Sequence, residues 1–118
     1  MRRSQTSLQT DFDWQQLRQL AGEDAEFEAE LLTMFLTDAD SSLMQLEQAV
    51  ANQDAGTVEE VAHSLRGASA NVGAIALAKV ASELENTARS GQLADSQRLL
   101  QQLQHHCENL KVALNSRA

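Results

Sequence analysis

His63 is the residue of this 118-residue sequence best placed to do chemistry, because of the side chains spaced three and four positions from it. Arg66 and Gly67 follow it and Glu59 precedes it at those spacings, so a helix would bring them together on one surface. A histidine side chain in water has a pKa of about 6.5, so a neutral imidazole is available as a nucleophile near neutral pH. The planar guanidinium of Arg66 suits phosphate oxygens. These residue types favour phosphoryl transfer to an imidazole.

Gly67 gives a second indication, because a glycine inside a helix costs about 1 kcal/mol relative to alanine. With no side chain at that position, a bulky partner could approach the imidazole closely. Phosphoryl transfer depends on alignment and charge neutralisation, and no carboxylate cluster for Mg²⁺ is evident beside His63. We therefore expect no cofactor of the chain's own, and a Mg²⁺ ion supplied by the partner. On these residues alone, an ordinary surface histidine stays open as the alternative.

The elements that must position these residues are helices. Apolar residues recur every three or four positions, and no sustained apolar/polar alternation indicates a strand. Helices are expected at about 12–21, 24–53, 57–72, 75–90 and 95–114. Asp11 or Asp13 is the expected cap of the first, and Thr57 with Glu60 a capping box for the third. Short links predict an all-α, antiparallel up-down four-helix bundle, with the short N-terminal helix over one end.

The third predicted helix has a clear core face, which fixes the direction of His63. Gly73 is where this helix is expected to stop, and His63 falls roughly 140° from the centre of the core face at 100° per residue. The histidine should therefore point to solvent. The residues that cluster on the core face are Val58, Ala62, Leu65, Ser69 and Val72.

Composition excludes several classes of protein. The net charge of -8 argues against nucleic acid and anionic membrane surfaces as partners, and no apolar run is long enough for a membrane span. A single cysteine, Cys107, fits a reducing compartment, so a cytoplasmic location is expected. Residues 1–10 are expected to form a flexible tail without an apolar signal segment, and residues 11–118 one domain.

The stretch 62–74, A-H-S-L-R-G-A-S-A-N-V-G-A, resembles the signature of histidine-containing phosphotransfer (HPt) domains. The shared pattern is a histidine, a basic residue three positions on, a glycine four on, small residues, and a second glycine ten after the histidine. The family usually has lysine where Arg66 stands. The following segment also looks like the helix after the motif in that family, through Leu77, Ala81, Leu84, Glu85, Ala88, Arg89 and Gly91.

The resemblance implies a role for each matched residue. His63 would be the phosphoacceptor, through the ring nitrogen farther from the backbone; Arg66 would hold the phosphoryl group; and Gly67 would allow access. Ser69 and Gly73 would serve close helix packing. The partners would be response-regulator receiver domains with Mg²⁺, a hybrid histidine kinase, or both. The chain would be a monomeric phosphorelay intermediate, a carrier and not an enzyme with its own kinase domain. For docking we expect exposed apolar residues of the first helix and the early second helix.

Other candidate residues give weaker indications of a functional site. Adjacent residues point in different directions on a helix, so His105, His106 and Cys107 are not expected to hold a metal. The acidic run is interpreted as a solvated helix face, and two methionines, Met34 and Met44, as core filler. No nucleotide-binding or hydrolase motif is present. A helical-bundle adaptor that binds a partner without chemistry is the alternative function. The acidic run consists of Glu23, Asp24, Glu26, Glu28 and Glu30.

Overall fold

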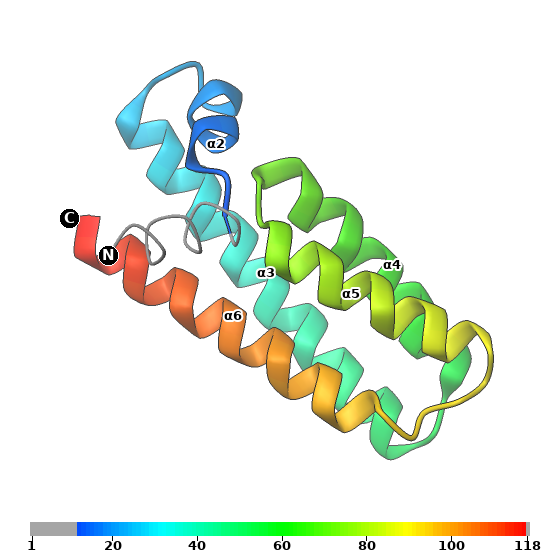
Figure 1. Cartoon of the computed structure of the whole chain (residues 1–118). Coiled ribbons are helices and arrows are strands. Elements are labelled where there is room, and N and C mark those ends of the chain that lie inside the picture. The colour runs from blue at the N-terminus through cyan, green and yellow to red at the C-terminus, as the bar shows by residue number, and fades with distance from the viewer. Residues whose placement is uncertain (1–11, 118) are drawn as a thin grey trace, which may run out of the picture.

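The computed structural model describes residues 12–117, which are almost entirely helical and contain no strand. The helices are α2 (Trp14–Leu20), α3 (Ala25–Ala51), α4 (Ala55–Val72), α5 (Ile75–Arg89) and α6 (Ser96–Arg117). Helices α3 to α6 form an antiparallel up-down bundle, and α2 lies over one end of it against α3 and α4 (Figure 1). The predicted fold class is confirmed. The expected tail at 1–10 and the cap candidate Asp11 lie outside the described residues.

Aspartates begin three of the helices, because a carboxylate satisfies the unpaired N–H groups of a first turn. The predicted capping box of Thr57 and Glu60 is wrong. Helix α4 begins two residues before Thr57, at Ala55, and Asp54 caps it by accepting from the Thr57 N–H at 3.2 Å and from its hydroxyl at 2.6 Å. The three capping aspartates are Asp13 for α2, Asp24 for α3 and Asp54 for α4.

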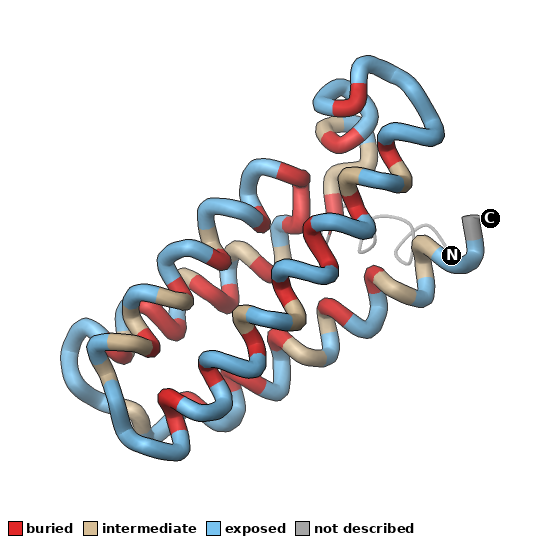
Figure 2. The backbone as a smooth tube through the Cα atoms, turned by 180° about the vertical axis from the view of Figure 1, so that it is seen from behind, coloured by how far each residue is buried: buried red, intermediate tan, exposed pale blue. Residues whose placement is uncertain are grey.

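The core runs along the bundle axis, where the apolar stripes of α3 to α6 meet (Figure 2). Burying one such leucine or valine contributes about 1.5–3 kcal/mol to folding. Cys107 belongs to this core, and burial raises the pKa of its thiol to about 11. Fully buried side chains from every helix meet there, including Leu17, Leu32, Leu46, Val58, Leu77, Leu84 and Leu103.

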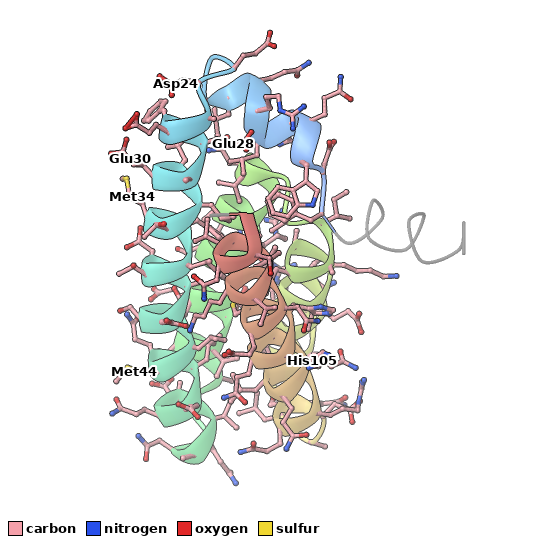
Figure 3. The ribbon with its side chains drawn as sticks, turned by 90° about the vertical axis from the view of Figure 1, so that its left-hand side faces the viewer. Asp24, Glu28, Glu30, Met34, Met44 and His105 are labelled. Atoms are coloured by element: carbon pink, nitrogen blue, oxygen red, sulfur yellow. The ribbon has the colours of Figure 1, made fainter. Side chains whose placement is uncertain are left out.

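Helix α3 departs from the prediction at its outer face. Met34 and Met44 were expected in the core, but they are 60% and 62% exposed, and Phe27 is 44% exposed. The buried stripe of α3 lies on the side that faces α4 and α6, whereas both methionines project outward (Figure 3). Glu28, expected on a solvated face, is only 2% exposed, because α2 covers this end and Arg18 Nε lies 3.5 Å from its carboxylate.

The link between α4 and α5 is two residues long, so the two helices are antiparallel neighbours. Gly73 ends α4 with φ +91°, as its position predicted, and a Cβ there would lie 2.6 Å from the Asp13 carbonyl oxygen. The Asp13 N–H donates to the Gly73 carbonyl at 2.7 Å, and the Gln16 amide donates to two carbonyls near the end of α4. The start of the described chain is thereby tied to this link. None of the helices within 12–117 has the length and apolar character required to cross a membrane.

Candidate functional site

His63 lies on the outer face of α4, and its side chain is 61% exposed. The opposite face of the same helix is buried against the bundle, as the helical wheel predicts, so burial of that face determines which way the imidazole points. Arg66 lies one turn further along and is 41% exposed. The two side chains whose spacing suggested chemistry are therefore neighbours at the surface.

Glu85 of α5 holds the inner side of this pair. Its Oε2 lies 2.8 Å from Nδ1 of His63, and its Oε1 accepts from Nε of Arg66 at 2.8 Å. The residue is only 5% exposed. The hydrogen bond from His63, with pairing to Arg66, holds the pKa of this carboxyl below its usual value even though burial opposes ionisation. Glu85 is therefore a carboxylate, which can only accept hydrogen bonds.

This carboxylate decides which ring nitrogen of His63 carries the proton. A short contact between Nδ1 and a carboxylate oxygen requires a proton between them, so Nδ1 donates to Glu85. The Nη2 of Arg66 also lies 3.0 Å from Nδ1, but a guanidinium only donates, so this contact is a close approach rather than a hydrogen bond. In the neutral ring Nε2 then has a free lone pair. Nε2 is the nitrogen farther from the backbone.

A second arginine extends the network across the two helices. Nη2 of Arg89, one turn beyond Glu85 on α5, donates to the same Oε2 that His63 contacts, at 2.9 Å. Nε of Arg89 donates to Glu59 of α4 at 3.0 Å, and this glutamate raises the pKa of the guanidinium. The result is a chain of alternating charges, from Glu59 through Arg89 and Glu85 to Arg66, with the imidazole on its outer side.

Gly67 and its surroundings are open. A Cβ built at Gly67 meets no atom within 4 Å, so the glycine is not required for packing among the described residues. Beside it, a shallow groove runs between α3 and α4. Met34 lies on the α3 side of the groove, and Ser64 and Ala68 lie on the α4 side. An approaching molecule therefore meets no obstruction at Gly67.

The other two residues of the motif lie away from the imidazole. Ser69 is fully buried on the core face of α4, and its hydroxyl has no hydrogen-bond partner among the described residues. Gly73 is at the link to α5, against Asp13. The structure thus brings together His63, Arg66 and Gly67, with Ser69 and Gly73 on the packed side.

Sequence reasoning assigned no role to Glu85, Arg89 or the pairing of Glu59. A signal for Glu85 was present. Glu85 falls between Ala81 and Ala88 on the buried stripe of α5, where an unpaired carboxylate would be strongly unfavourable. A charged residue inside an apolar stripe indicates a polar partner on a facing helix. The identity of that partner needs the fold.

The remaining candidates do not form a site. Cys107 faces the core, while His105 is exposed, and the ring centroids of His105 and His106 are 6.1 Å apart. Within residues 12–117 no group of three or more histidine, cysteine, aspartate or glutamate side chains is arranged to hold a metal ion.

Comparisons with known proteins place the chain in a family and match its fold. Residues 30–113 match the Hpt domain family. The crystal structure of histidine-containing phosphotransfer protein B (HptB) from Pseudomonas aeruginosa PAO1 is similar, with a TM-score of 0.84 and 29% sequence identity over 91% of this chain and 93% of that chain. The HPT domain of the Hpt sensor hybrid histidine kinase from Shewanella shares the fold, with a TM-score of 0.73 and 19% identity over 91% and 92% of the two chains. No curated protein sequence matches.

The chain belongs to the Hpt domain family, which its sequence motif had indicated. Hpt domains are phosphocarrier modules and not kinases, so this chain is a histidine-containing phosphotransfer protein.

Proposed function

We propose that the protein is a phosphorelay intermediate that accepts a phosphoryl group on Nε2 of His63 from an aspartyl phosphate and passes it to another aspartate. The observation that carries this proposal is the 2.8 Å contact between Nδ1 of His63 and Glu85, on a ring that is 61% exposed. It leaves the lone pair of Nε2 available to a partner.

The transfer needs no general base on this chain. The Nε2 lone pair forms the N–P bond while the O–P bond of the aspartyl phosphate breaks, and that electron pair returns to the aspartate carboxylate. Nδ1 keeps its proton, so the phosphorylated ring is a cation, which the carboxylate of Glu85 stabilises. When the N–P bond of this cation breaks, its electron pair returns to Nε2 and a neutral imidazole leaves, which is a good leaving group. The same contact therefore supports transfer from His63 to the next aspartate.

Charge neutralisation is shared between the two proteins. Arg66 supplies a guanidinium one turn from His63, and its planar donors suit phosphoryl oxygens. The remaining positive charge comes from the partner, which we propose is a receiver domain, alone or within a hybrid histidine kinase. A Mg²⁺ ion bound by that partner would supply positive charge to offset the charge that develops on the transferred group.

The partner would dock on the side of α2 and the early part of α3, next to the groove beside Gly67. Exposed apolar residues lie there, with Leu20 43%, Phe27 44% and Met34 60% exposed. Exposed apolar side chains near a reactive group are typical of a recognition surface. The open space at Gly67 would admit the edge of a receiver's active site.

A transfer assay tests the proposal directly. Several receiver domains would be charged with acetyl phosphate and Mg²⁺, and label would be followed onto wild type, His63→Gln and His105→Gln. His105 is an exposed histidine of α6 and serves as the matched control. We expect label on wild type and on His105→Gln, and none on His63→Gln.

The alternative function, an adaptor without chemistry, makes the opposite prediction. A folded protein that no receiver labels, and whose binding to partners survives His63→Gln, would contradict phosphoryl carriage and favour the adaptor. Equal labelling of wild type and His63→Gln would move the phosphoacceptor away from His63.

A further inference from the structure

Arg66 is already engaged in the unphosphorylated protein. Its Nε donates to Oε1 of Glu85 at 2.8 Å, and its Nη2 lies on the Nδ1 side of His63 rather than the Nε2 side. To reach a phosphoryl group on Nε2, the guanidinium must loosen its pairing with Glu85. That movement would remove one of the cations that compensate a 5% exposed carboxylate.

Arg89 supplies the second cation of this carboxylate. It donates to Oε2 of Glu85 at 2.9 Å, the oxygen that also accepts from Nδ1 of His63, whereas Arg66 pairs with Oε1. Departure of Arg66 therefore leaves the contacts at Oε2 in place. Without Arg89, the carboxylate and a phosphoryl group of about −1.5 to −2 charge would compete for the one guanidinium of Arg66.

Glu59 fixes Arg89 from the other helix. Its Oε2 accepts from Nε of Arg89 at 3.0 Å, and it lies one turn before His63 on α4. Because this pair joins α4 to α5, the guanidinium of Arg89 is held by a carboxylate from each helix. Neither contact involves the outer side of the imidazole, so a docked partner need not disturb them.

We propose that Arg89, held by Glu59, is a positioning residue that keeps Glu85 against Nδ1 of His63 while Arg66 passes from Glu85 to the phosphoryl group. This inference rests on the proposed function, since it assigns a task within phosphoryl transfer to His63. Arg89 touches neither the ring nor the phosphoryl group and acts through Glu85.

The test compares Arg89→Gln with Arg98→Gln. Each change removes one exposed arginine that pairs with a carboxylate, because the side chains are 58% and 55% exposed and Arg98 pairs with Asp95 at 3.3 Å. The phosphodonor is phosphoramidate, whose P–N bond breaks to release ammonia as the bond to Nε2 forms, so no receiver is required. Mass spectrometry would follow the label on His63, with the exposed His105 of the same molecule as internal reference.

We expect Arg89→Gln to slow labelling of His63 by on the order of tenfold relative to His105. Without Arg89, Glu85 would be misplaced relative to Nδ1 of His63, and Arg66 would stay paired with Glu85. Arg98→Gln should leave the ratio unchanged, and Arg89→Lys should restore most of it. In a Glu85→Gln background, Arg89→Gln should have no further effect, since Arg89 acts through that carboxylate. An effect of Arg89→Gln that adds fully to that of Glu85→Gln would overturn the proposal.

Failure of this inference is distinguishable from failure of the proposed function. Equal rates for wild type and Arg89→Gln, with transfer from a receiver intact in both, would remove Arg89 from the mechanism and leave the relay standing. Absence of transfer from every receiver to wild type, with His63 and His105 labelled alike, would reject the relay itself. Long-range ¹H–¹⁵N spectra of the imidazoles add a readout without transfer: the proton of phosphorylated His63 should stay on Nδ1 in wild type and exchange faster in Arg89→Gln.

Discussion

Nδ1 of His63 on α4 lies 2.8 Å from Oε2 of Glu85 on α5, so a carboxylate of one helix sets the proton position on the imidazole of the next. This relationship leaves the lone pair of Nε2 free in the neutral ring, on a side chain that is 61% exposed. It also allows the ring to stay protonated on Nδ1 after phosphorylation.

Replacing Glu85 by glutamine should impair the reactivity of His63 without unfolding the protein. The amide keeps the shape and one acceptor but loses the charge that stabilises a cationic ring. We expect labelling of His63 by phosphoramidate to fall by roughly 10- to 100-fold, by analogy with the loss of a carboxylate that orients a metal-binding imidazole. Glu83→Gln is the matched control, because Glu83 is an exposed glutamate of the same helix. Similar rates for the two variants would contradict the assignment.

The stability of the protein should depend on the ionisation of Glu85. Its pKa in the folded chain is lowered from 4.5, first by the hydrogen bond from His63 and then by Arg66. The resulting contribution to the free energy of unfolding is complete above pH 4.5 and is lost as the pH falls through the lowered value. Urea denaturation of wild type and Glu85→Gln between pH 7 and 3 (roughly spanning this window) should show the stability difference narrowing in acid. A stability difference between the two proteins that stays constant over this pH range would refute the contribution of the Glu85 carboxylate.

Two substitutions at Gly67 distinguish its effect on protein stability from its effect on the partner's access to His63. Alanine there meets no atom within 4 Å, so Gly67→Ala should raise the free energy of unfolding by about 1 kcal/mol. Gly67→Gln should slow transfer from a receiver by at least about tenfold, because its side chain occupies the approach path. Labelling of the same variant by phosphoramidate, a much smaller donor, should change little. Equal slowing with both donors would show that the glycine matters for the chemistry and not for the approach of the partner.

Gly73 has a different requirement, which is structural. With φ +91° and the Asp13 carbonyl oxygen 2.6 Å from an added Cβ, Gly73→Ala should destabilise by about 1–3 kcal/mol through strain and contact. Gly91→Ala is the control, because Gly91 has φ +77° but open space around it. Thermal unfolding should show a larger drop in Tm for Gly73→Ala. A smaller drop than for Gly91→Ala would contradict the close contact with Asp13.

Two exposed methionines of α3 test the docking side. Met34 is 60% exposed and borders the groove between α3 and α4, whereas Met44 is 62% exposed and lies further along the helix, outside that groove (Figure 3). With a receiver identified by the transfer assay, Met34→Glu should weaken binding about tenfold or more, as expected for an apolar contact inside an interface. Met44→Glu should have no effect on calorimetric titration. The reverse order would place docking elsewhere.

Much of the fold follows from local rules that the sequence displays openly. Apolar spacing located the helices to within a few residues, and Gly73 marked the end of α4, because both depend on residues close in the chain. The outward direction of His63 followed from the core face of its own helix. The cap of α4 was misplaced because Asp54 accepts from the backbone N–H of Thr57. In the predicted capping box, the side chain of Glu60 would have accepted from that N–H group.

What the sequence left undetermined depends on contacts between distant helices. Met34 and Met44 are apolar residues of a helix, which is why they were predicted to be buried. Only the placement of α4 and α6 decides which side of α3 is covered. Glu28 looks like its acidic neighbours and is buried because α2 lies over it. Arg89 lies within reach on the same helix, but the other two partners of Glu85, Arg66 and His63, come from 19 and 22 positions away, beyond any periodicity within α5.

The short link at Gly73 has a consequence for how partners can change. Because α4 and α5 are consecutive and joined by two residues, the whole network around His63, from Glu59 to Arg89, belongs to a single helical hairpin. The apolar surface around Met34 is encoded separately, on α3. The proposed chemistry and the α3 part of the proposed docking surface thus occupy different stretches of the chain. Substitutions on α3 could therefore change which partner the protein binds, while the residues of the α4–α5 hairpin stay the same.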